Sequence, residues 1–486
     1  MDWFVLIERW YAVIAFVSYI LVVLLVGGRI LMSGKTVGAT LAWILLVIIL
    51  PLVGALLYVI LGESFIGQYR QNKAKSAFLK YIDFIQNMPL QPSVLSVRDD
   101  DPAKPLWDQT YGSIKLPPYC GNATEILSSS NVALDRLLED IKGASKTIFI
   151  EFYICHEGGR VDPILDELVV ASKRGVNVCL ILDSIGSRDF IAGEKAIKMV
   201  EQGVVIVEAL KATFFRLTLR RRDLRMHRKL IVIDCDIAYT GSMNLADPEF
   251  FNQDANVGEW IDLMVRIRGP VIPSMERVFI NDWLMEGRLD HVESRTSLPL
   301  AIENGIPIQV VPSGPAIANE NLIHLLLLAI YNAKASIDIT TPYFVPDDSI
   351  ILALKGAALR GVKVSIYLPF KNDSWLAKYA GHSFYEELLI SGVRICPFRD
   401  GLLHTKCVLI DKQIALVGSV NLDMRSIWLN FEITIVVSSH EFCSIIDGII
   451  EEYNSASDTI DLERWRTRSI SRKIIEQLTR LLSPLL

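Results

Sequence analysis

Six residue types occur twice in the chain at the same internal spacing. Each copy begins with His-x-Lys, continues to an Asp, and ends in Gly-Ser-x-Asn. The first copy comprises His227, Lys229, Asp234, Gly241, Ser242 and Asn244, and the second comprises His404, Lys406, Asp411, Gly418, Ser419 and Asn421. A single His-x-Lys usually lies on the surface and has no function, whereas a matched pair of motifs of this length indicates a duplication with a function.

These residue types suit the transfer of a phosphodiester group. One His can attack phosphorus and form a phosphohistidine, while another protonates the leaving alcohol and then deprotonates the incoming one. Lys and Asn side chains can stabilise the phosphoryl oxygens. We therefore expect the two copies to form one site whose imidazoles titrate as a coupled pair near neutral pH. Since the sequence holds no carboxylate cluster or Cys/His ligand set, we expect catalysis without a metal or other cofactor.

The alternation of side chains along a strand divides each motif between two faces. If His-x-Lys begins a strand, His and Lys share one face and the following Asp lies on the other. Asp234 and Asp411 belong to the predicted catalytic motif, but this parity favours a structural role for both. Ser242 and Asn244 again share a face, and so do Ser419 and Asn421, after a Gly that permits close approach of the backbone.

Strand-like and helix-like segments alternate around both motifs, as two α/β domains require. The same order recurs in each half, and its clearest segments are 147–153, 163–174 and 176–182, then 336–343, a helix ending at Arg360, and 362–368. This pattern predicts two duplicated α/β domains with a shared active site. Each should contain a largely parallel or mixed sheet with helices on both faces.

The amino-terminal region predicts a helical hairpin in a membrane. Trp10–Gly28 and Thr36–Gly62 contain no charged residue, and about 20 apolar residues span the hydrocarbon core of a bilayer. Pro51 lies within the second stretch, where lipid tolerates a kink. A cleaved signal peptide is the alternative for the first stretch, but its leading end lacks a basic region and a second apolar stretch follows.

Length and proline content define the remaining domain boundaries. We predict a transmembrane hairpin over residues 1–62, a connector over 63–120, a first α/β domain over 121–290 and a second over 300–486. Prolines interrupt the connector, which should therefore hold no long helix. The second domain ends in a basic amphipathic tail from Ile470, which either lies on the bilayer or packs as a terminal helix.

Composition excludes several classes of protein. Hydrophobic residues make up 51% and charged residues 21% of the chain, and its mean hydropathy is +0.34, which is too apolar for an ordinary soluble enzyme. The net charge of -6 argues against a general nucleic-acid binder. Seven Cys without a CxxC pair argue against a disulfide framework or a zinc site.

The positions of basic residues predict the orientation in the membrane. Two lie between the apolar stretches and four follow the second stretch, namely Arg29 and Lys35, then Arg70, Lys73, Lys75 and Lys80. Because positively charged flanks stay inside, the α/β domains should be cytoplasmic.

A second basic run precedes the first motif. Between Lys211 and Lys229, basic and apolar side chains are interleaved, and the residues expected to contact a lipid headgroup are Arg220, Arg221, Arg222 and Arg225. Such a run beside a catalytic strand suits an anionic headgroup at a membrane surface. A nucleic-acid patch and a solvated helix face are the alternatives.

The paired motif resembles the HKD signature of the phospholipase D superfamily, and nearly the whole chain resembles bacterial cardiolipin synthases with an amino-terminal hairpin. The segments that carry this resemblance are Tyr239–Asn244, His404–Lys406, Asn421–Ser426, Asn430–Glu432 and the Ser-Pro-Leu-Leu ending. The resemblance implies that two phosphatidylglycerols become cardiolipin and glycerol, with His227 as the nucleophile and His404 as the general acid and base.

The resemblance also implies an acidic residue behind the active His. Glu432 matches this position in the second half, whereas extra residues after Asn244 leave Asp262 or Glu259 for the first. It further implies a multi-pass protein of the bacterial inner membrane, with phosphatidylglycerol and cardiolipin as lipid partners and no nucleic acid. The sequence leaves the oligomeric state open.

Three other functions compete with this interpretation. A phospholipase D-type hydrolase, or a phosphatidyltransferase with another alcohol acceptor, would use the same residues. A nuclease is a further alternative, because some members of the superfamily cleave nucleic acids. A membrane scaffold with a fossil site is disfavoured, because His, Lys and Asn are intact in both copies.

Overall fold

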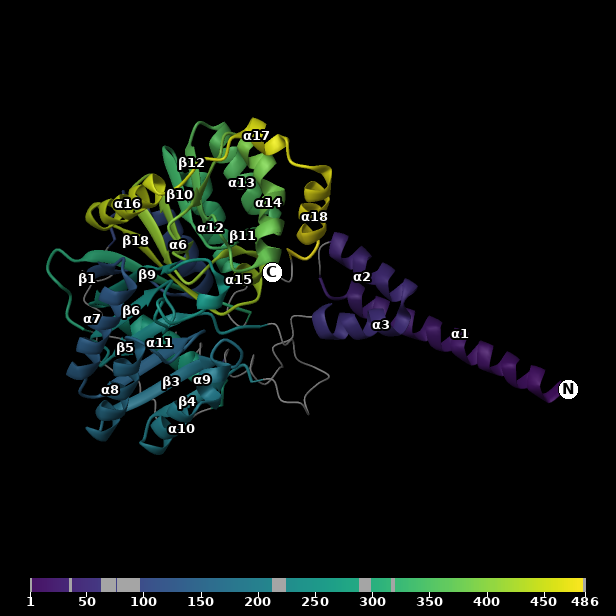
Figure 1. The fold of residues 1–486 in the computed structure, drawn as a ribbon, viewed down its shortest axis with the longest axis horizontal. Coiled ribbons are helices and arrows are strands. Elements are labelled where there is room, and N and C mark those ends of the chain that lie inside the picture. Colours follow the sequence, from purple (N-terminus) through teal and green to yellow (C-terminus); the bar gives the residue numbers. More distant parts are fainter. Residues whose placement is uncertain are drawn as a thin grey trace. The chain divides into compact units, whose positions relative to one another are not determined.

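The computed structural model describes residues 2–34, 37–62, 76, 97–211, 224–287, 299–315 and 320–483 (Figure 1). Several predicted features lie outside these residues, namely Lys35, Arg70, Lys73, Lys75, Lys80, Arg220, Arg221, Arg222, most of the connector and the last three residues of the Ser-Pro-Leu-Leu ending. The chain divides into an amino-terminal helical unit and a larger α/β unit, which are considered separately.

A 14-stranded mixed sheet forms the centre of the α/β unit. The strands of the first half are β1 (Tyr119–Leu127), β2 (Thr147–Phe152), β3 (Asn177–Asp183), β4 (Val205–Ala209), β5 (Lys229–Ile233), β6 (Ile237–Gly241) and β8 (Met264–Arg268). Those of the second half are β9 (Ile306–Ser313), β10 (Ser336–Thr340), β12 (Lys363–Pro369), β13 (Arg394–Phe398), β15 (Cys407–Ile410), β16 (Ile414–Gly418) and β18 (Glu432–Ser438).

The two halves of this sheet have the same topology. From the middle outward, the strand order is β1-β8-β6-β5-β2-β3-β4 in the first half and β9-β18-β16-β15-β10-β12-β13 in the second. The three outermost strands are parallel in each half and the others are antiparallel. Antiparallel pairing of β1 with β9 joins the halves. The predicted duplication and mixed sheet are confirmed.

Helices cover the two faces of the sheet because side chains alternate along each strand. In β2, Ile148 and Ile150 belong to the same buried cluster as Leu134 of α7 and Leu165 of α8, whereas Phe149 points the other way and stacks on Phe279 of α11 with ring centroids 4.8 Å apart. The helices of the first half are α7 (Ser130–Gly143), α8 (Val161–Lys173), α9 (Arg188–Ala192), α10 (Glu194–Glu201) and α11 (Ile272–Met285).

The second half has a corresponding set of helices. They are α12 (Asn321–Asn332), α13 (Asp348–Leu359), α14 (Trp375–Ile390), α15 (Met424–Trp428), α16 (His440–Ser455), α17 (Leu462–Arg466) and α18 (Ile470–Arg480). Helix α14 follows α13 and β12 in the chain, and α18 packs against it (Figure 1).

The last part of the predicted connector belongs to the α/β unit. Helix α6 (Lys104–Ile114) has Pro105 in its first turn, where a helix tolerates proline. Leu106 and Trp107 are buried in the core of the second half, and Gln109 donates a hydrogen bond of 3.1 Å to Asn321 of α12. A short helix is therefore compatible with the prolines because its apolar side chains pack against the fold.

Among the described residues of the amino-terminal unit, one helix is long enough to cross a membrane. Helix α1 (Asp2–Leu31) includes the apolar span Glu8–Leu31. The second apolar stretch, Thr36–Gly62, is interrupted at Pro51, where the sequence allowed a kink. Its described part forms α2 (Val37–Ile49), α3 (Pro51–Leu57) and a short π-helix (Tyr58–Gly62).

The break between α2 and α3 follows from Pro51 and Gly54. Leu50 leaves the helical conformation just before Pro51, and α3 folds back so closely that a Cβ on Gly54 would lie 2.7 Å from the carbonyl oxygen of Leu46. The ring of Tyr58 then packs edge-on against Trp43, with centroids 5.4 Å apart. At about 1.5 Å per residue, α2 is too short to cross the hydrocarbon core by itself.

Candidate active site

Main-chain pairing between the halves places each motif His beside an acidic residue of the other half. Met226 and Phe431 form a parallel bridge, so the next residues, His227 and Glu432, lie side by side. The amide of His227 donates to the carbonyl oxygen of Phe431 at 2.9 Å. The register of one short pairing thus determines which carboxylate meets this imidazole.

The second motif repeats this arrangement with the halves exchanged. Strand β14 (Leu402–Leu403) pairs in parallel with β7 (Trp260–Ile261), and the amide of His404 donates to the carbonyl oxygen of Ile261 at 2.9 Å. His404 therefore lies beside Asp262. Of the two acidic residues that the sequence left open, Asp262 occupies the position and Glu259 is exposed to solvent.

Both imidazoles bind a carboxylate through Nδ1. Nδ1 of His227 lies 2.9 Å from each carboxylate oxygen of Glu432, and Nδ1 of His404 lies 2.7 Å from Oδ1 of Asp262. With Nδ1–H donating to a carboxylate, Nε2 of each ring is the nitrogen left for chemistry. The acidic partner of each His crosses from one half to the other, which the sequence did not predict.

The motif Ser residues orient these carboxylates. Ser242 donates to Asp262 at 2.6 Å, and Ser419 donates to Glu432 at 2.5 Å. The Gly before each Ser is needed for this approach, because a Cβ on Gly241 or Gly418 would lie 2.2 Å from a carbonyl oxygen of the neighbouring strand. Ser242 and Ser419, predicted as phosphate-binding or supporting residues, thus each hold a carboxylate in place.

A cavity of about 460 Å³ lies between the halves and receives both motif His side chains. Asn244 and Asn421 also line it, and the buried amide oxygen of each has no hydrogen-bond partner among the described residues. Its other lining side chains include Tyr153, Trp260, Tyr343, Ser374, Ala377, Arg225, Arg425 and Asn430. Polar groups from both repeats thus face one space of the size that binds small ligands.

The two motif Lys side chains are buried beside the cavity. Nζ of Lys229 donates to the carbonyl oxygen of His227 at 2.9 Å, and Nζ of Lys406 donates to that of His404 at 2.6 Å. Burial lowers the pKa of Lys229 to about 7 and that of Lys406 to about 8. A bound phosphate would favour the charged form of both amines, because an anion raises the pKa of a neighbouring cation.

The two His-carboxylate pairs differ in their electrostatics. Burial raises the pKa of Glu432 to about 7, with Lys229 opposing the rise. Burial also acts on Asp262, but His404, Lys406 and Ser242 outweigh it and hold the pKa of this carboxyl below its ordinary value. Asp262 is therefore the stronger partner for an imidazolium, because it stays ionised over a wider pH range.

Burial favours the neutral form of both imidazoles. Burial lowers the pKa of His227 well below its ordinary value, and the charges of Lys229 and Lys406 lower it further. Burial lowers the pKa of His404 to about 4, while Asp262 opposes the change. Asp262 thus favours protonation of His404 over a wider pH range than Glu432 favours protonation of His227.

Asp234 and Asp411 are not among the residues that line the cavity, and their contacts are those of the structural role that strand parity favours. Each follows its strand in a tight turn, where positive φ occurs at Asp234 and Cys235 and again at Asp411 and Lys412. Asp234 accepts hydrogen bonds of 2.7–2.8 Å from the backbone amides of residues 145–147. Asp411 accepts equivalent bonds from residues 334–336.

Replacing Asp234 by Ala should destabilise the fold and leave the chemistry intact. The amides of residues 145–147 would lose their acceptor, which should cost about 1–2 kcal/mol because the turn is partly solvated. We expect a lower thermal midpoint for Asp234→Ala and for Asp411→Ala, measured on the full-length protein. The matched control is Asp236→Ala, which removes only an exposed ion pair with Arg268 and should change stability by less than about 1 kcal/mol. A large loss of turnover per folded molecule would contradict this structural role.

The predicted lipid-headgroup run is only partly described. Arg225 lines the cavity, whereas Arg220, Arg221 and Arg222 lie outside the described residues. Arg228, between the motif His and Lys, is fully buried on the opposite face and forms an ion pair of 2.9 Å with Asp282 of α11. It anchors the strand and cannot contact a lipid headgroup.

The aromatic side chains around the two imidazoles were not among the predicted site residues. The ring of Tyr153 lies 5.1 Å from that of His227, and the ring of Trp260 lies 4.4 Å from that of His404. Tyr343 lines the same cavity and donates a hydrogen bond to Asp373 at 2.8 Å. The duplication held a usable signal, since Tyr153 and Tyr343 follow corresponding strands in the two halves.

Among the described residues, no group of three or more His, Cys, Asp or Glu side chains is arranged to hold a metal ion.

Two family models match the chain. The model described as "Cardiolipin synthase, PLD-like domain" matches residues 137–283 and 326–454, which contain the two motifs. The model described as "Phospholipase_D-nuclease N-terminal" matches residues 12–63.

The similarity to known proteins covers nearly the whole chain. Cardiolipin synthase A of Serratia proteamaculans (strain 568) is 42% identical over 461 residues, covering 94% of this chain and 95% of that protein. Cardiolipin synthase A of Proteus mirabilis (strain HI4320) is 38% identical over 482 residues, covering 98% and 99%. The crystal structure of phosphatidylserine synthase from Haemophilus influenzae Rd KW20 has a TM-score of 0.60 at 16% identity, covering 79% of this chain and all of that one, and shows the fold alone.

Proposed function

The chain belongs to the cardiolipin synthase family of phospholipase D-like phosphatidyltransferases, and we propose that it transfers a phosphatidyl group between two phosphatidylglycerol molecules to give cardiolipin and glycerol. The observation that carries this proposal is the single cavity that receives His227 and His404, each with a carboxylate on Nδ1. Two imidazoles in one cavity supply the nucleophile and the proton donor that the transfer needs.

In the first step, Nε2 of His227 attacks the phosphorus of the donor phosphatidylglycerol. The bond from phosphorus to the glycerol oxygen breaks, and His404 gives its Nε2 proton to that oxygen, so that glycerol leaves. Glu432 holds the Nδ1 proton of His227 and stabilises the positive charge that develops on the ring. The product is a phosphatidyl group bound to His227 through a phosphorus–nitrogen bond.

In the second step, neutral His404 removes the proton from a terminal hydroxyl of a second phosphatidylglycerol. The hydroxyl oxygen attacks phosphorus, the bond to His227 breaks, and cardiolipin leaves. Lys229, Lys406, Asn244 and Asn421 are proposed to stabilise the phosphoryl oxygens in both steps. Water in place of the second lipid would give phosphatidic acid, so the cavity has to favour the lipid hydroxyl.

The difference between the two carboxylates supports this order of roles. A nucleophile must be neutral when it attacks, and Glu432, with its pKa of about 7, favours a charged His227 less than Asp262 favours a charged His404. An acid must carry a proton when the donor is bound, and ionised Asp262 together with the lipid phosphate favours that form of His404. His227 is therefore the proposed nucleophile and His404 the proposed acid and base.

The protein is membrane-associated and its family acts on phospholipids. We further propose a multi-pass arrangement in the bacterial inner membrane, with the α/β unit in the cytoplasm. The charge asymmetry of the amino-terminal flanks supports this orientation. All seven Cys lie in the described part of the chain, and none forms a disulfide, as in a reducing compartment. We propose that no nucleic acid is a substrate.

Products formed from a single lipid test this function directly. The purified full-length enzyme, incubated with phosphatidylglycerol vesicles and a metal chelator, should release one glycerol for each cardiolipin formed. Phosphatidic acid as the main product would instead identify a hydrolase, and cardiolipin formation that requires another alcohol or a nucleotide would also overturn the proposal. Mass spectrometry of the lipids, with enzymatic assay of glycerol, measures both products.

A further inference from the structure

The carboxyl-terminal helix α18 has its polar face against the protein and its apolar face outward. Glu476 and Thr479 are buried, whereas Ile470, Ile474, Leu478 and Leu481 are 77%, 53%, 59% and 76% exposed. A surface helix of a globular protein normally buries its apolar side chains. The reversal leaves a row of large apolar side chains along the outside of α18.

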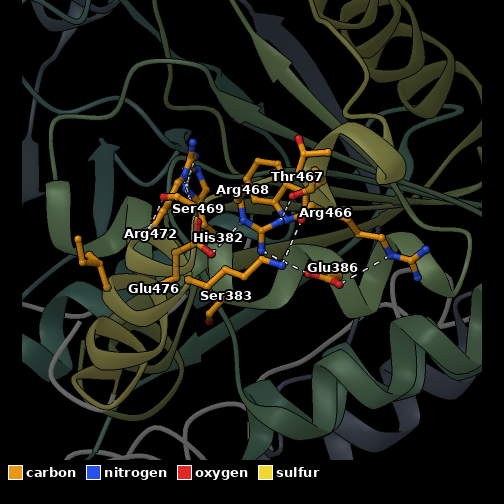
Figure 2. Close-up of polar contacts among 12 residues, drawn as sticks. His382, Ser383, Glu386, Arg466, Thr467, Arg468, Ser469, Arg472 and Glu476 are labelled. Carbon is orange, nitrogen blue, oxygen red and sulfur yellow. Dashed lines mark hydrogen bonds and ion pairs between the residues drawn. The ribbon is translucent and has the colours of Figure 1, made fainter.

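A network of ion pairs determines this orientation (Figure 2). The Arg468 guanidinium donates to Glu476 at 3.2 Å and to Glu386 of α14 at 3.4 Å. Arg472 donates to the other carboxylate oxygen of Glu476 at 3.2 Å and contacts Nδ1 of His382 at 3.4 Å. Glu476 is only 1% exposed. Rotating α18 about its axis would separate this carboxylate from its Arg partners, which is costly for a buried charge, so the fold specifies the outward apolar face.

The same surface continues along α14 to the active-site cavity. Trp375, Tyr379 and His382 share one face of α14, with ring centroids 4.9 Å and 5.7 Å apart between neighbours. Since His382 contacts α18, the Trp375 ring, which is 56% exposed, lies on the face of α14 toward α18. Ser374 and Ala377, in the same turn as Trp375, line the cavity.

Basic side chains accompany the apolar row. Arg464 is exposed, and Arg466, Arg472 and Arg480 are each partly exposed, with side-chain fractions of 44%, 42% and 33%. The exposed acidic residues nearby are Asp461, Glu463 and Asp348, and Asp348 pairs with Arg480. Apolar side chains between cations, with an exposed Trp beside them, match the chemistry of an anionic lipid surface, where apolar groups enter the acyl boundary and cations meet phosphates.

We propose that Ile470, Ile474 and Leu478 of α18, the next residue after the helix, Leu481, and Trp375 of α14 form a docking face that lies on an anionic phospholipid bilayer and brings the cavity to its lipid substrates. This inference deepens the proposed function, because it states how the α/β unit meets the membrane in addition to the apolar helix α1. A second copy of the chain, or another part of the same chain, would be the competing occupant of the docking face.

Fluorescence quenching by lipid tests the docking face without turnover. The full-length protein carries Cys120→Ser, because the other six Cys are buried, and a single Leu478→Cys labelled with an environment-sensitive fluorophore. The probe is a vesicle of phosphatidylglycerol and phosphatidylcholine with brominated acyl chains. We expect the label to lose roughly half of its emission, since an interfacial helix buries its apolar face about 5–10 Å into the headgroup boundary.

Ile197→Cys on α10 is the matched control, because Ile197 is similarly exposed at 53% on the other half of the α/β unit. Its label should keep its emission in the same vesicles. Equal emission from both positions would overturn the docking face. An apolar emission maximum at Leu478 without quenching would show that protein covers the helix, and would overturn it as well.

The double substitution Ile474→Glu with Leu478→Glu tests the consequence for activity. Both side chains point outward, so the fold should tolerate them. We expect the vesicle concentration at half-maximal rate to rise about tenfold, with kcat unchanged and with unchanged turnover of a soluble short-chain phosphatidylglycerol. An equal loss on both substrates would show that the face supports folding and would overturn docking. Failure of the proposed function would appear differently, as a wrong product with normal quenching.

Discussion

Replacing His227 by Ala should lower the rate of cardiolipin formation by at least about 10⁴-fold, because the variant lacks the imidazole proposed to form the covalent intermediate. His404→Ala should cause a comparable loss with phosphatidylglycerol, since glycerol then leaves without a proton. The two variants should differ with a donor whose leaving group needs no proton. With such a donor, only His404→Ala should form a phosphatidyl-enzyme, and it should accumulate because nothing activates the acceptor.

Mapping the modified residue decides the assignment. Brief reaction of His404→Ala with a nitrophenyl phosphatidyl ester, followed by mass spectrometry under neutral conditions, should locate the phosphatidyl group on His227. A phosphatidyl group on His404 in the His227→Ala variant, with none in His404→Ala, would reverse the two roles. His382→Ala serves as a control for loss of a buried His outside the cavity, and its donor cleavage should persist.

The Glu432→Gln substitution should reduce kcat by about 10²–10⁴-fold and also change the pH profile. Burial raises the pKa of Glu432 to about 7, so the carboxylate is ionised above this pH and gains a proton as the pH falls through it. Protonation weakens its hold on the Nδ1 proton of His227, and the wild-type rate should therefore fall below neutral pH. Glu432→Gln should be slow and should lack this acid limb.

Asp262→Asn provides the matched comparison across the pseudo-symmetric site. It should also lower kcat, because His404 loses the carboxylate on Nδ1. The pKa of Asp262 lies below its ordinary value, so this group stays ionised through neutral pH and its replacement should leave the acid limb in place. Loss of the limb in Asp262→Asn, or its persistence in Glu432→Gln, would contradict the assignment of the limb to Glu432.

Local rules predicted much of the site. The duplicated spacing indicated one shared site, and both motif His side chains do line one cavity. Strand parity separated Asp234 and Asp411 from the groups that face it, and the motif Gly residues do lie where no Cβ fits. These inferences needed only the period of a strand and the size of a side chain, which the sequence contains. The catalytic roles and the domain boundaries stay predictions.

The crosswise pairing of His and acid could not be predicted from local rules. It depends on the register between Met226 and Phe431, which lie far apart in the chain, and no nearby pattern specifies that register. The choice of Asp262 over Glu259 has the same origin, because the bond from His404 to the carbonyl of Ile261 selects the next side chain.

Two other features also depended on distant contacts. The second apolar stretch looks continuous in composition, and its reversal at Leu50 depends on how α3 packs on α2 at Gly54. The outward apolar face of α18 depends on Glu386 and His382 of α14, which hold the polar face. In both cases the sequence showed the apolar or amphipathic pattern of the segment, but it did not show which residues that segment packs against.

The pairing of β1 with β9 has a consequence for how the enzyme can cycle. Backbone hydrogen bonds run from one repeat into the other through this seam, so a rotation of one repeat against the other would have to break the sheet. The two repeats that form this active site are thus held in one relative orientation by the continuous sheet. Catalysis has to proceed without the hinge bending by which many two-lobed enzymes admit and release their ligands. Under the proposed function, both lipids would then bind and leave while the two repeats keep one relative orientation.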